Sequence, residues 1–237
     1  MANRTLAFMF GVAALLIAAA CGFFVSASRA DAATGPQFLI TWKANGSYVP
    51  PNYPGKALPT YGSRITASIE LLRANGTLAN LSGQTIYWYL NGTLLGGGVG
   101  AQTISFPPFG QAPGSMTLEV DLPNYNGSFL IHSITIPMAG PKAVIEAPYP
   151  NGQFSANPFV LAAIPYFFNT SSSDNLSYFW NINGQTGGNA ENPMTAQVTL
   201  PKGTAAGTAI SASVQVSNGG DSTQASASEN LTYQPSL

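Results

Sequence analysis

Hydrophobic and polar residues alternate with a period of two over several stretches of this chain. From Ile65 to Leu71 every second residue is apolar, and the residues between them are polar or charged. The stretch Met116 to Leu122 has the same alternation, with Thr117, Glu119 and Asp121 on its polar side. A period of two buries one face of a strand and leaves the other in water, as in an antiparallel sandwich. With no clear helical period after the N-terminal leader, the pattern predicts an all-β protein of antiparallel strands.

Asn-Gly pairs separate many of these stretches. The dipeptide suits the type I′ turn of a two-residue hairpin, because both central residues of that turn need a positive φ. The pairs begin at Asn45, Asn75, Asn91, Asn126, Asn151, Asn183 and Asn218. Several of these asparagines also start an Asn-x-Ser/Thr sequon, and two interpretations stay open: a glycosylated surface, or simply good hairpin sequences, which we favour.

An internal repeat predicts two copies of one fold. Tyr87–Gly92 (YWYLNG) recurs as Phe179–Gly184 (FWNING), with the same order of aromatic, tryptophan, aliphatic, asparagine and glycine. Further on, Val120–Pro123 recurs as Val198–Pro201. Each of these segments is followed by an alternating strand, 129–136 in the first copy and 209–216 in the second, and we expect these two strands to correspond. The predicted modules are 36–138 and 142–235, joined by a short linker at 139–141.

Trp88 and Trp180 are the predicted core signature of the two modules. Each tryptophan shares its strand face with aliphatic residues, Ile86 and Leu90 in the first copy and Ile182 in the second. An inward tryptophan on the third strand is the central core residue of an immunoglobulin-like sandwich. We therefore predict two tandem immunoglobulin-like antiparallel β-sandwiches. The single cysteine lies in the leader, so neither sandwich can contain a disulfide.

The second module resembles the PKD (polycystic kidney disease) domain family over residues 157–235. The matching features are the serine-rich turn Phe168–Asp174, the strand Leu176–Trp180 and the valine-rich strand Val214–Asn218. The family's acidic Trp-Asp-Phe-Gly-Asp-Gly hallmark is replaced by Trp180–Gln185 (WNINGQ), so both acidic positions are lost. The resemblance implies a PKD-type extracellular spacer or interaction module of the kind found in surface proteins and secreted hydrolases.

Residues 1–32 predict a targeting segment that precedes the sandwiches. Arg4 is followed by an unbroken apolar run from residue 6 to 25, which we expect to form a hydrophobic helix, and then by Ala30-Asp31-Ala32. The Ala-x-Ala pattern favours a signal peptide cleaved after Ala32, whereas the length of the run would also suit a retained membrane anchor. A third alternative is lipidation of Cys21, because Ala18–Cys21 resembles a bacterial lipobox. In each case the protein is exported to the cell surface, periplasm or medium, and membrane contact is expected only through this segment.

Composition and motifs argue against nucleic-acid binding, catalysis and a phosphate-binding loop. Only 7% of the residues are charged and the net charge is −1, so no basic surface for nucleic acid is expected. His132, the only histidine, is interpreted as a strand residue rather than a catalytic base, and Glu119 with Asp121 as a solvated strand face. The glycine run 96–100 lacks the ending of a phosphate loop and is interpreted as a flexible hairpin connection. We therefore predict a protein that is not an enzyme and needs no cofactor or metal.

One loop carries a binding hypothesis. Between the first two predicted strands, residues 47–62 carry Tyr48, Tyr53 and Tyr61 among four prolines. Prolines stiffen such a loop, and exposed tyrosines contact sugars or proteins at low entropic cost. The alternative is that these tyrosines cap the open end of the sandwich.

The sequence as a whole predicts a non-catalytic, exported structural or adhesion protein with a protein or polysaccharide partner at the cell surface. The second hypothesis is a carbohydrate-binding protein that uses exposed tyrosine and tryptophan residues.

Overall fold

The computed structural model describes residues 35–110, 112–147 and 149–235. The expectations for the leader, namely the hydrophobic helix, the cleavage site and Cys21, lie outside these residues. Across the described ranges, no helix is long and apolar enough to cross a membrane. Residues 35–237 form one contact unit, within which the buried hydrophobic side chains gather in two separate cores.

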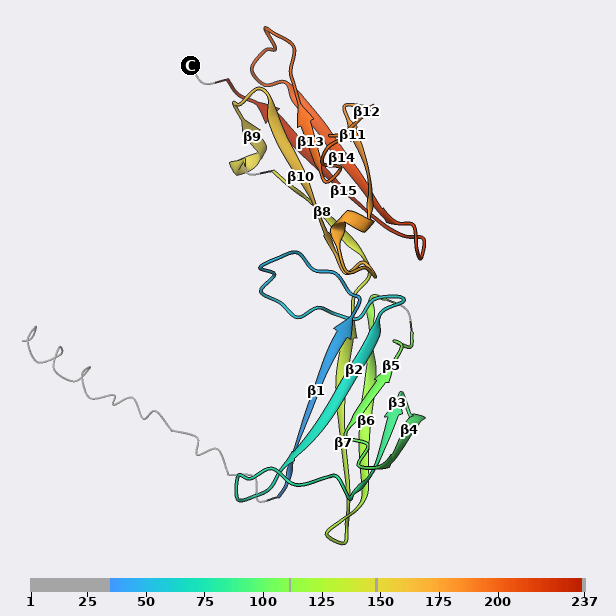
Figure 1. Cartoon of the computed structure of the whole chain (residues 1–237). Coiled ribbons are helices and arrows are strands. Elements are labelled where there is room, and N and C mark those ends of the chain that lie inside the picture. The colour runs from blue at the N-terminus through green and yellow to red at the C-terminus, as the bar shows by residue number, and fades with distance from the viewer. Residues whose placement is uncertain (1–34, 111, 148, 236–237) are drawn as a thin grey trace, which may run out of the picture. The chain divides into compact units, whose positions relative to one another are not determined.

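The first core lies between two antiparallel sheets (Figure 1). The strands of the first sheet, in the order β1-β2-β5, are β1 (Gln37–Asn45), β2 (Arg64–Leu72) and β5 (Thr103–Phe106). The strands of the second, in the order β4-β3-β6-β7, are β4 (Thr93–Val99), β3 (Thr85–Leu90), β6 (Gly114–Tyr125) and β7 (Ser128–Met138). The alternation predicted for residues 65–71 and 116–122 is confirmed, since their apolar members are buried in this core.

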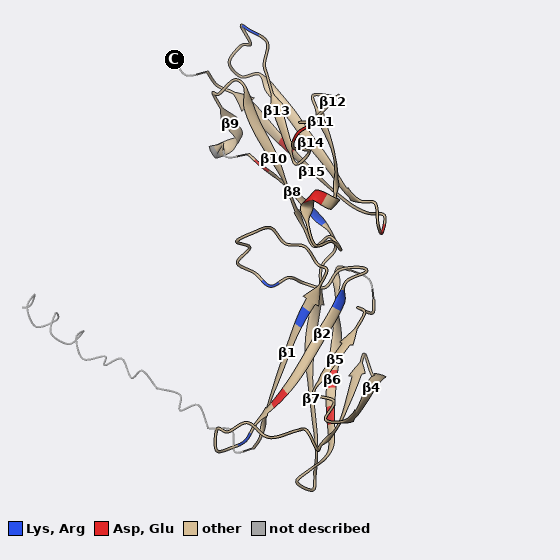
Figure 2. Cartoon of the chain, viewed as in Figure 1, with Lys and Arg blue, Asp and Glu red and all other residues tan. Residues whose placement is uncertain are grey.

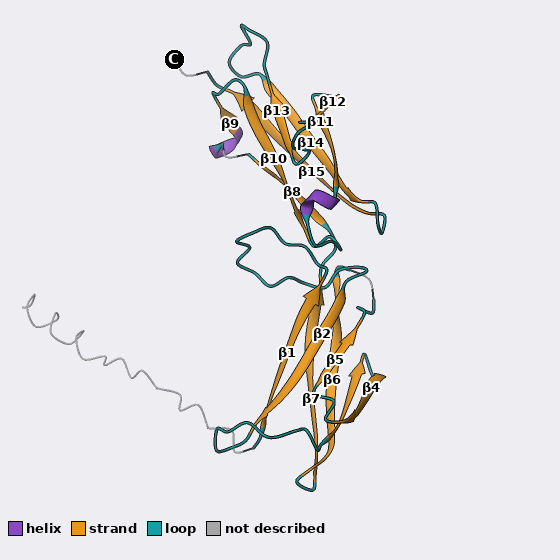
Figure 3. Ribbon diagram, viewed as in Figure 1, coloured by secondary structure: helices purple, strands orange, loops and turns teal. Residues whose placement is uncertain are grey.

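The second core lies between two further sheets (Figure 3). One sheet, in the order β13-β10-β8, consists of β8 (Lys142–Glu146), β10 (Phe159–Tyr166) and β13 (Thr195–Val198). The other, in the order β12-β11-β14-β15-β9, consists of β9 (Gln153–Phe154), β11 (Ser177–Ile182), β12 (Gln185–Gly187), β14 (Ala209–Asn218) and β15 (Thr223–Tyr233). The short β9 runs parallel to β15, and the other pairings are antiparallel. The described helical segments are single 3₁₀ turns, η1 (Pro150–Gly152) and η2 (Ser173–Asn175).

The two sandwiches share one topology. In each, the first, second and fifth main strands form one sheet, and the fourth, third, sixth and seventh form the other, when β9 is left aside. The first, second and fifth strands face the third, sixth and seventh as in an immunoglobulin-like sandwich, whereas the fourth strand lies beside the third instead of joining the first sheet as in a constant-type immunoglobulin domain. The prediction of an all-β protein built from immunoglobulin-like antiparallel sandwiches is confirmed at this level.

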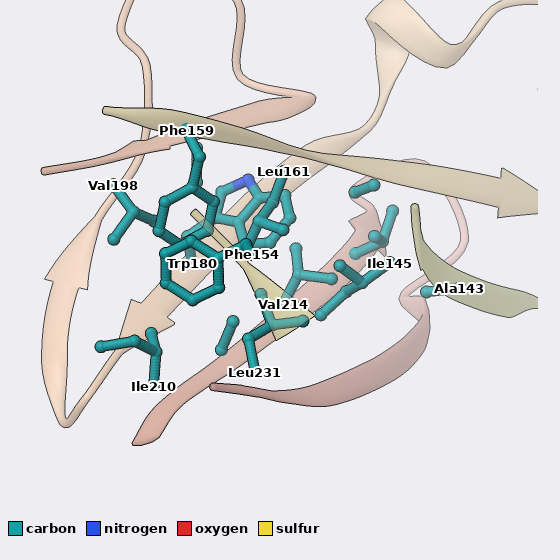
Figure 4. Close-up of a cluster of buried hydrophobic side chains, with 14 of the residues drawn as sticks. Ala143, Ile145, Phe154, Phe159, Leu161, Trp180, Val198, Ile210, Val214 and Leu231 are labelled. Carbon is teal, nitrogen blue, oxygen red and sulfur yellow. The ribbon is translucent and has the colours of Figure 1, made fainter. Parts of the chain in front are cut away.

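Trp88 and Trp180 occupy equivalent places in the two cores. Both side chains are buried, and Figure 4 shows Trp180 among Phe154, Phe159 and Leu161. Each indole Nε1–H donates to a backbone carbonyl thirteen residues further on, Ala101 at 2.8 Å and Pro193 at 3.1 Å. A buried indole needs such a partner for its single donor, and both sandwiches supply it from the segment that leads into the fifth strand.

The Asn-Gly prediction is right for part of the set. Both residues of the pair have a positive φ in the hairpins at Asn91, Asn126 and Asn183 and in the turn at Asn151. The pairs at Asn45, Asn75 and Asn218 are different, because their asparagines do not adopt a positive φ. At Asn218 the side chain explains the difference: it is buried, donates to the Asn169 carbonyl at 3.0 Å and accepts from the Gly220 amide at 3.0 Å.

Two expectations from the sequence were wrong. Val120–Pro123 lies in β6, whereas Val198–Pro201 lies at the end of β13, so these segments belong to non-equivalent strands. The strands matched after them, 129–136 in β7 and 209–216 in β14, are not equivalent either, because the counterpart of β14 is β6. A strand that ends in Leu-Pro before a turn is too common a pattern to fix the alignment. The glycine run was expected to be a flexible connection, but Gly96–Gly98 lies within β4, and the preceding hairpin turn is made by Asn91 and Gly92.

Candidate functional site

The outward face of the sheet β4-β3-β6-β7 is the most distinctive surface of the first sandwich. Because strand side chains alternate, the residues between the buried Ile86, Trp88 and Leu90 point away from the core. We call this face the platform. Its members are Tyr87, Tyr89, Leu94, Gly97, Val99, Glu119, Asp121, Phe129, Ile131 and Ser133.

Strand register brings the platform residues together in rows. In one row Tyr87 of β3 is paired with Asp121 of β6, which is paired with Ile131 of β7. In the next row Tyr89 is paired with Glu119. Directly opposed residues of neighbouring strands lie on the same face with Cβ atoms about 5 Å apart, so each carboxylate lies beside a tyrosine.

The platform is unusually apolar for a face that no described segment covers. Val99 is 70% exposed, Phe129 57%, Leu94 54% and Ile131 51%. Single exposed apolar residues are normal on a protein surface, but several on one sheet face are typical of a contact surface.

Gly97 shapes the platform beside Tyr87. A Cβ atom at Gly97 would meet the carbonyl oxygen of Ile86 and the ring of Tyr87. The absence of a side chain therefore lets the Tyr87 ring lie against β4. This contact explains why glycine is found within a strand here rather than in a flexible connection.

Asp121 is the least expected member of the platform. The sequence predicted a solvated carboxylate, but the residue is only 9% exposed, and its Oδ1 atom is buried without a hydrogen-bond partner. Its direct cross-strand neighbours, Tyr87 and Ile131, are too apolar over most of their surface to solvate it. Burial, together with the negative charge of Glu119, raises the pKa of the Asp121 carboxyl above its ordinary value.

The corresponding face of the second sandwich is polar and provides an internal comparison. The row Tyr87–Asp121–Ile131 corresponds to Phe179–Gln215–Ser226. The row Tyr89–Glu119–Ser133 corresponds to Asn181–Ser213–Ser228. The same scaffold thus has an ordinary hydrophilic face in one copy, with Phe179 its exposed aromatic residue, and an apolar, acidic face in the other.

The tyrosines singled out in the sequence have different surroundings. Tyr48 is half-buried, and its backbone pairs with the second sandwich: its amide donates to the Phe168 carbonyl at 2.8 Å and its carbonyl accepts from the Phe167 amide at 2.6 Å. The Tyr53 ring lies edge-on to Tyr166 and Phe167, with ring centroids 5.8 and 6.0 Å apart. These two tyrosines therefore make contacts within the chain.

Tyr61 is 66% exposed and is separate from the other two tyrosines in its surroundings. It lines an open hollow of about 830 Å³ whose wall includes Arg64, Pro107, Pro108 and Met138. The structure brings none of these tyrosines onto the platform.

The serine-rich turn that suggested a PKD-type module has a structural role in this chain. Ser172 caps η2 by accepting from the Asp174 amide, and the Tyr178 hydroxyl donates to the Ser173 carbonyl at 3.0 Å. Burial, with smaller contributions from Tyr48 and Asp174, raises the pKa of the Tyr178 hydroxyl, so it remains a donor at any ordinary pH.

His132 lies on the side of β7 that faces the core, so it does not belong to the platform. Its ring stacks on Phe38 of β1, with centroids 5.3 Å apart and planes 13° from parallel. No three histidine, cysteine, aspartate or glutamate residues gather as metal ligands in the part of the chain that the structure describes. The platform itself combines exposed apolar side chains with two tyrosines and two carboxylates.

The platform was missed from the sequence, although a signal was present. Tyr87 and Tyr89 flank the buried Trp88, and Phe129, Leu130 and Ile131 are consecutive apolar residues, so each strand carries large apolar groups on both faces. A strand that is apolar on both faces is expected where both faces are covered, by the core on one side and by another surface on the other.

Comparison with known proteins gives weak similarity. No family model and no curated protein sequence matches the chain. Among solved structures, the fibronectin(III)-like modules of Clostridium thermocellum CbhA are 15% identical over 83% of this chain and 94% of theirs, with a TM-score of 0.28. A Bacteroides ovatus mixed-linkage glucan utilization protein, SGBP-B, is 13% identical over 84% of this chain and 47% of its own, with a TM-score of 0.27. A bacterial ice-binding adhesin is 13% identical over 84% of this chain and 66% of its own, with a TM-score of 0.31. At these scores the similarities assign neither a family nor a function.

Proposed function

We propose that this chain is a non-catalytic, exported interaction protein whose first sandwich binds a partner protein through the platform. The observation that carries the proposal is the contrast between the two copies of the fold. Equivalent rows of the outward sheet faces hold one phenylalanine, one glutamine, one asparagine and three serines in the second copy, but two tyrosines, an isoleucine, one serine and two carboxylates in the first. Because both copies have the same fold, we attribute the difference between their outward faces to what each face contacts and not to the stability of the fold.

In this proposal the second sandwich is a PKD-like spacer. Its serine-rich turn, Tyr178 and Trp180 stabilise the module, and its outward face is hydrophilic. The N-terminal segment, as a cleaved signal peptide, an anchor or a lipidated leader, brings the protein to the cell surface or beyond. Tyr61 is retained as a second contact residue because of its exposure.

Site-specific photocrosslinking of the full chain in the cells that export it tests the proposal. Phe129 on the platform and Phe179 on the second sandwich have nearly the same exposure, 57% and 59%, so each can be replaced by a photoreactive phenylalanine analogue in a matched pair. We expect one discrete protein adduct at position 129, no adduct at 179, and loss of the adduct when Tyr87→Ala is added.

Equal adducts at both positions, or an adduct at 129 that is insensitive to Tyr87→Ala, would overturn the proposal. An adduct to a glycan at position 129 would favour the second hypothesis from the sequence, a carbohydrate-binding protein.

A further inference from the structure

We propose that the platform recognises an arginine side chain of the partner protein, with the guanidinium paired to Asp121 and stacked on Tyr87. This inference rests on the proposed function and specifies its ligand chemistry. It starts from Asp121, a carboxylate that is more than nine-tenths buried and whose Oδ1 has no hydrogen-bond partner. A buried carboxylate with an unsatisfied oxygen is costly, and a cation that lies over the platform would offset that cost.

The charge balance of the platform selects a cation. Glu119 and Asp121 lie two residues apart on β6 and point to the same side. The sequence has no lysine or arginine between Arg73 and Lys142, so the strands of this sheet supply no compensating charge (Figure 2). A neutral ligand such as a sugar would cover the rings but leave two adjacent carboxylates uncompensated.

The aromatic neighbours select arginine over a compact ammonium group. Tyr87 lies directly beside Asp121, and Tyr89 directly beside Glu119. A guanidinium is planar, donates two parallel hydrogen bonds to a carboxylate and stacks on an aromatic face, whereas a lysine ammonium is a strongly hydrated point charge.

The apolar members of the platform account for the remainder of the contact. Ile131 and Val99 flank the tyrosine and carboxylate rows and can cover the aliphatic stem of an arginine as well as apolar residues beside it. Exclusion of water by these groups strengthens the charged hydrogen bond at the centre.

Saturation-transfer NMR with the full chain in mild detergent tests the inference, because this method observes the small ligand and tolerates a large protein. The probes are N-acetyl-arginine methylamide, its lysine counterpart and its neutral citrulline counterpart, each at millimolar concentration. We expect the strongest transfer to the arginine side-chain protons, weaker transfer to lysine and none to citrulline. The arginine signal should fall at least tenfold in Asp121→Asn and in Tyr87→Leu and remain unchanged in Phe179→Ala.

Equal transfer to arginine and citrulline, or an arginine signal that persists in Asp121→Asn while circular dichroism shows an intact fold, would overturn the inference. These outcomes are distinguishable from failure of the proposed function. If crosslinking at Phe129 depends on Tyr87 but no arginine signal is found, the contact surface stands and only its ligand chemistry fails. A glucan oligosaccharide that gives transfer lost in Tyr87→Ala but kept in Asp121→Asn would likewise replace arginine with a sugar.

Discussion

At the scale of single residues, Asp121 combines a cost to the fold with the recognition role that we propose for it. Its carboxylate lies among apolar neighbours on the outward face of a sheet, and one of its oxygens is unpaired. A residue selected for stability alone would be uncharged at this position, as Gln215 is at the corresponding position of the second sandwich. Retention of a poorly solvated charge is typical of a site that exchanges stability for recognition.

The stability of the protein should therefore depend on the protonation of Asp121. The folded state raises the pKa of this carboxyl above 3.8, so over the interval between 3.8 and the raised value the folded state binds more protons than the unfolded state. The free energy of unfolding then falls as pH rises through that interval and is constant above it. The titratable groups that face Asp121 are Glu119 on its own strand and Tyr87 and Tyr89 on β3; the β7 residues on this face, Phe129, Ile131 and Ser133, are uncharged.

Asp121→Asn removes this contribution. We expect the variant to be more stable than the parent at neutral pH by about 1 kcal/mol, because the amide carries no charge to desolvate and none for Glu119 to repel. Its stability should lack the decline above pH 3.8 that we assign to Asp121. Urea titrations of both proteins over this pH range provide the measurement, and a less stable variant with an unchanged pH profile would contradict the assignment.

At the scale of elements, β4 shows how a strand is adapted to its neighbour. Gly97 has no room for a side chain, because the Ile86 carbonyl and the Tyr87 ring lie where its Cβ would be. The glycines weaken β4 as a strand but give Tyr87 a flat support beside Asp121. The glycines of β4 are therefore explained by the position of the Tyr87 ring and not by packing in the core.

Gly97→Ala should displace the Tyr87 ring and destabilise the protein by about 1–3 kcal/mol, the usual cost of overpacking. Gly187 on β12, the corresponding strand of the second sandwich, is a matched control, because a Cβ there would meet no atom within 4 Å. Gly187→Ala should change stability by less than about 0.5 kcal/mol. Thermal melts of the two variants and the tyrosine fluorescence of Gly97→Ala provide the measurements; equal effects at both glycines would exclude the steric explanation.

The sequence predicted those elements whose pattern is local. The period of two from Ile65 to Leu71 and the in-phase tryptophans depend only on neighbours along one strand, and both predictions agree with the structure. The burial of Asp121 depends on Tyr87 and Ile131, which lie on other strands, so no inspection of β6 alone could reveal it. The contact of Tyr53 with Tyr166 and Phe167 likewise joins residues more than a hundred positions apart.

At the scale of the whole molecule, two cores without shared residues are held in one chain. Buried residues from β2, β3 and β6 make the first core, and residues from β10, β11 and β14 make the second. Backbone hydrogen bonds from Tyr48 to Phe167 and Phe168 connect the loop after β1 to the second sandwich. These backbone bonds, together with the ring contacts of Tyr53 with Tyr166 and Phe167, are few beside the apolar burial within either core.

Truncation in one core should therefore affect chiefly that sandwich. Leu118 and Leu161 are both fully buried, one in each core. We expect Leu118→Ala and Leu161→Ala to destabilise their own sandwich by about 2–5 kcal/mol each. Differential scanning calorimetry should show two transitions, with a different one lowered in each variant; a single transition lowered equally by both would mean that the sandwiches unfold together.

The register of β1 determines how the first sandwich responds to a pulling force. β1 is paired with β2 over its full nine residues, from Gln37 opposite Leu72 to Asn45 opposite Arg64. The chain leaves this sandwich at the Asn45 end of β1, where the Ala139 amide donates to the Pro59 carbonyl at 3.0 Å. Tension applied before Gln37 and after Met138 therefore acts along β1 and loads its hydrogen bonds with β2 in shear, all at once, instead of peeling them one by one. Under force, the lifetime of the first sandwich is set by this collective rupture, which is a property of its unfolding rate and not of its equilibrium stability.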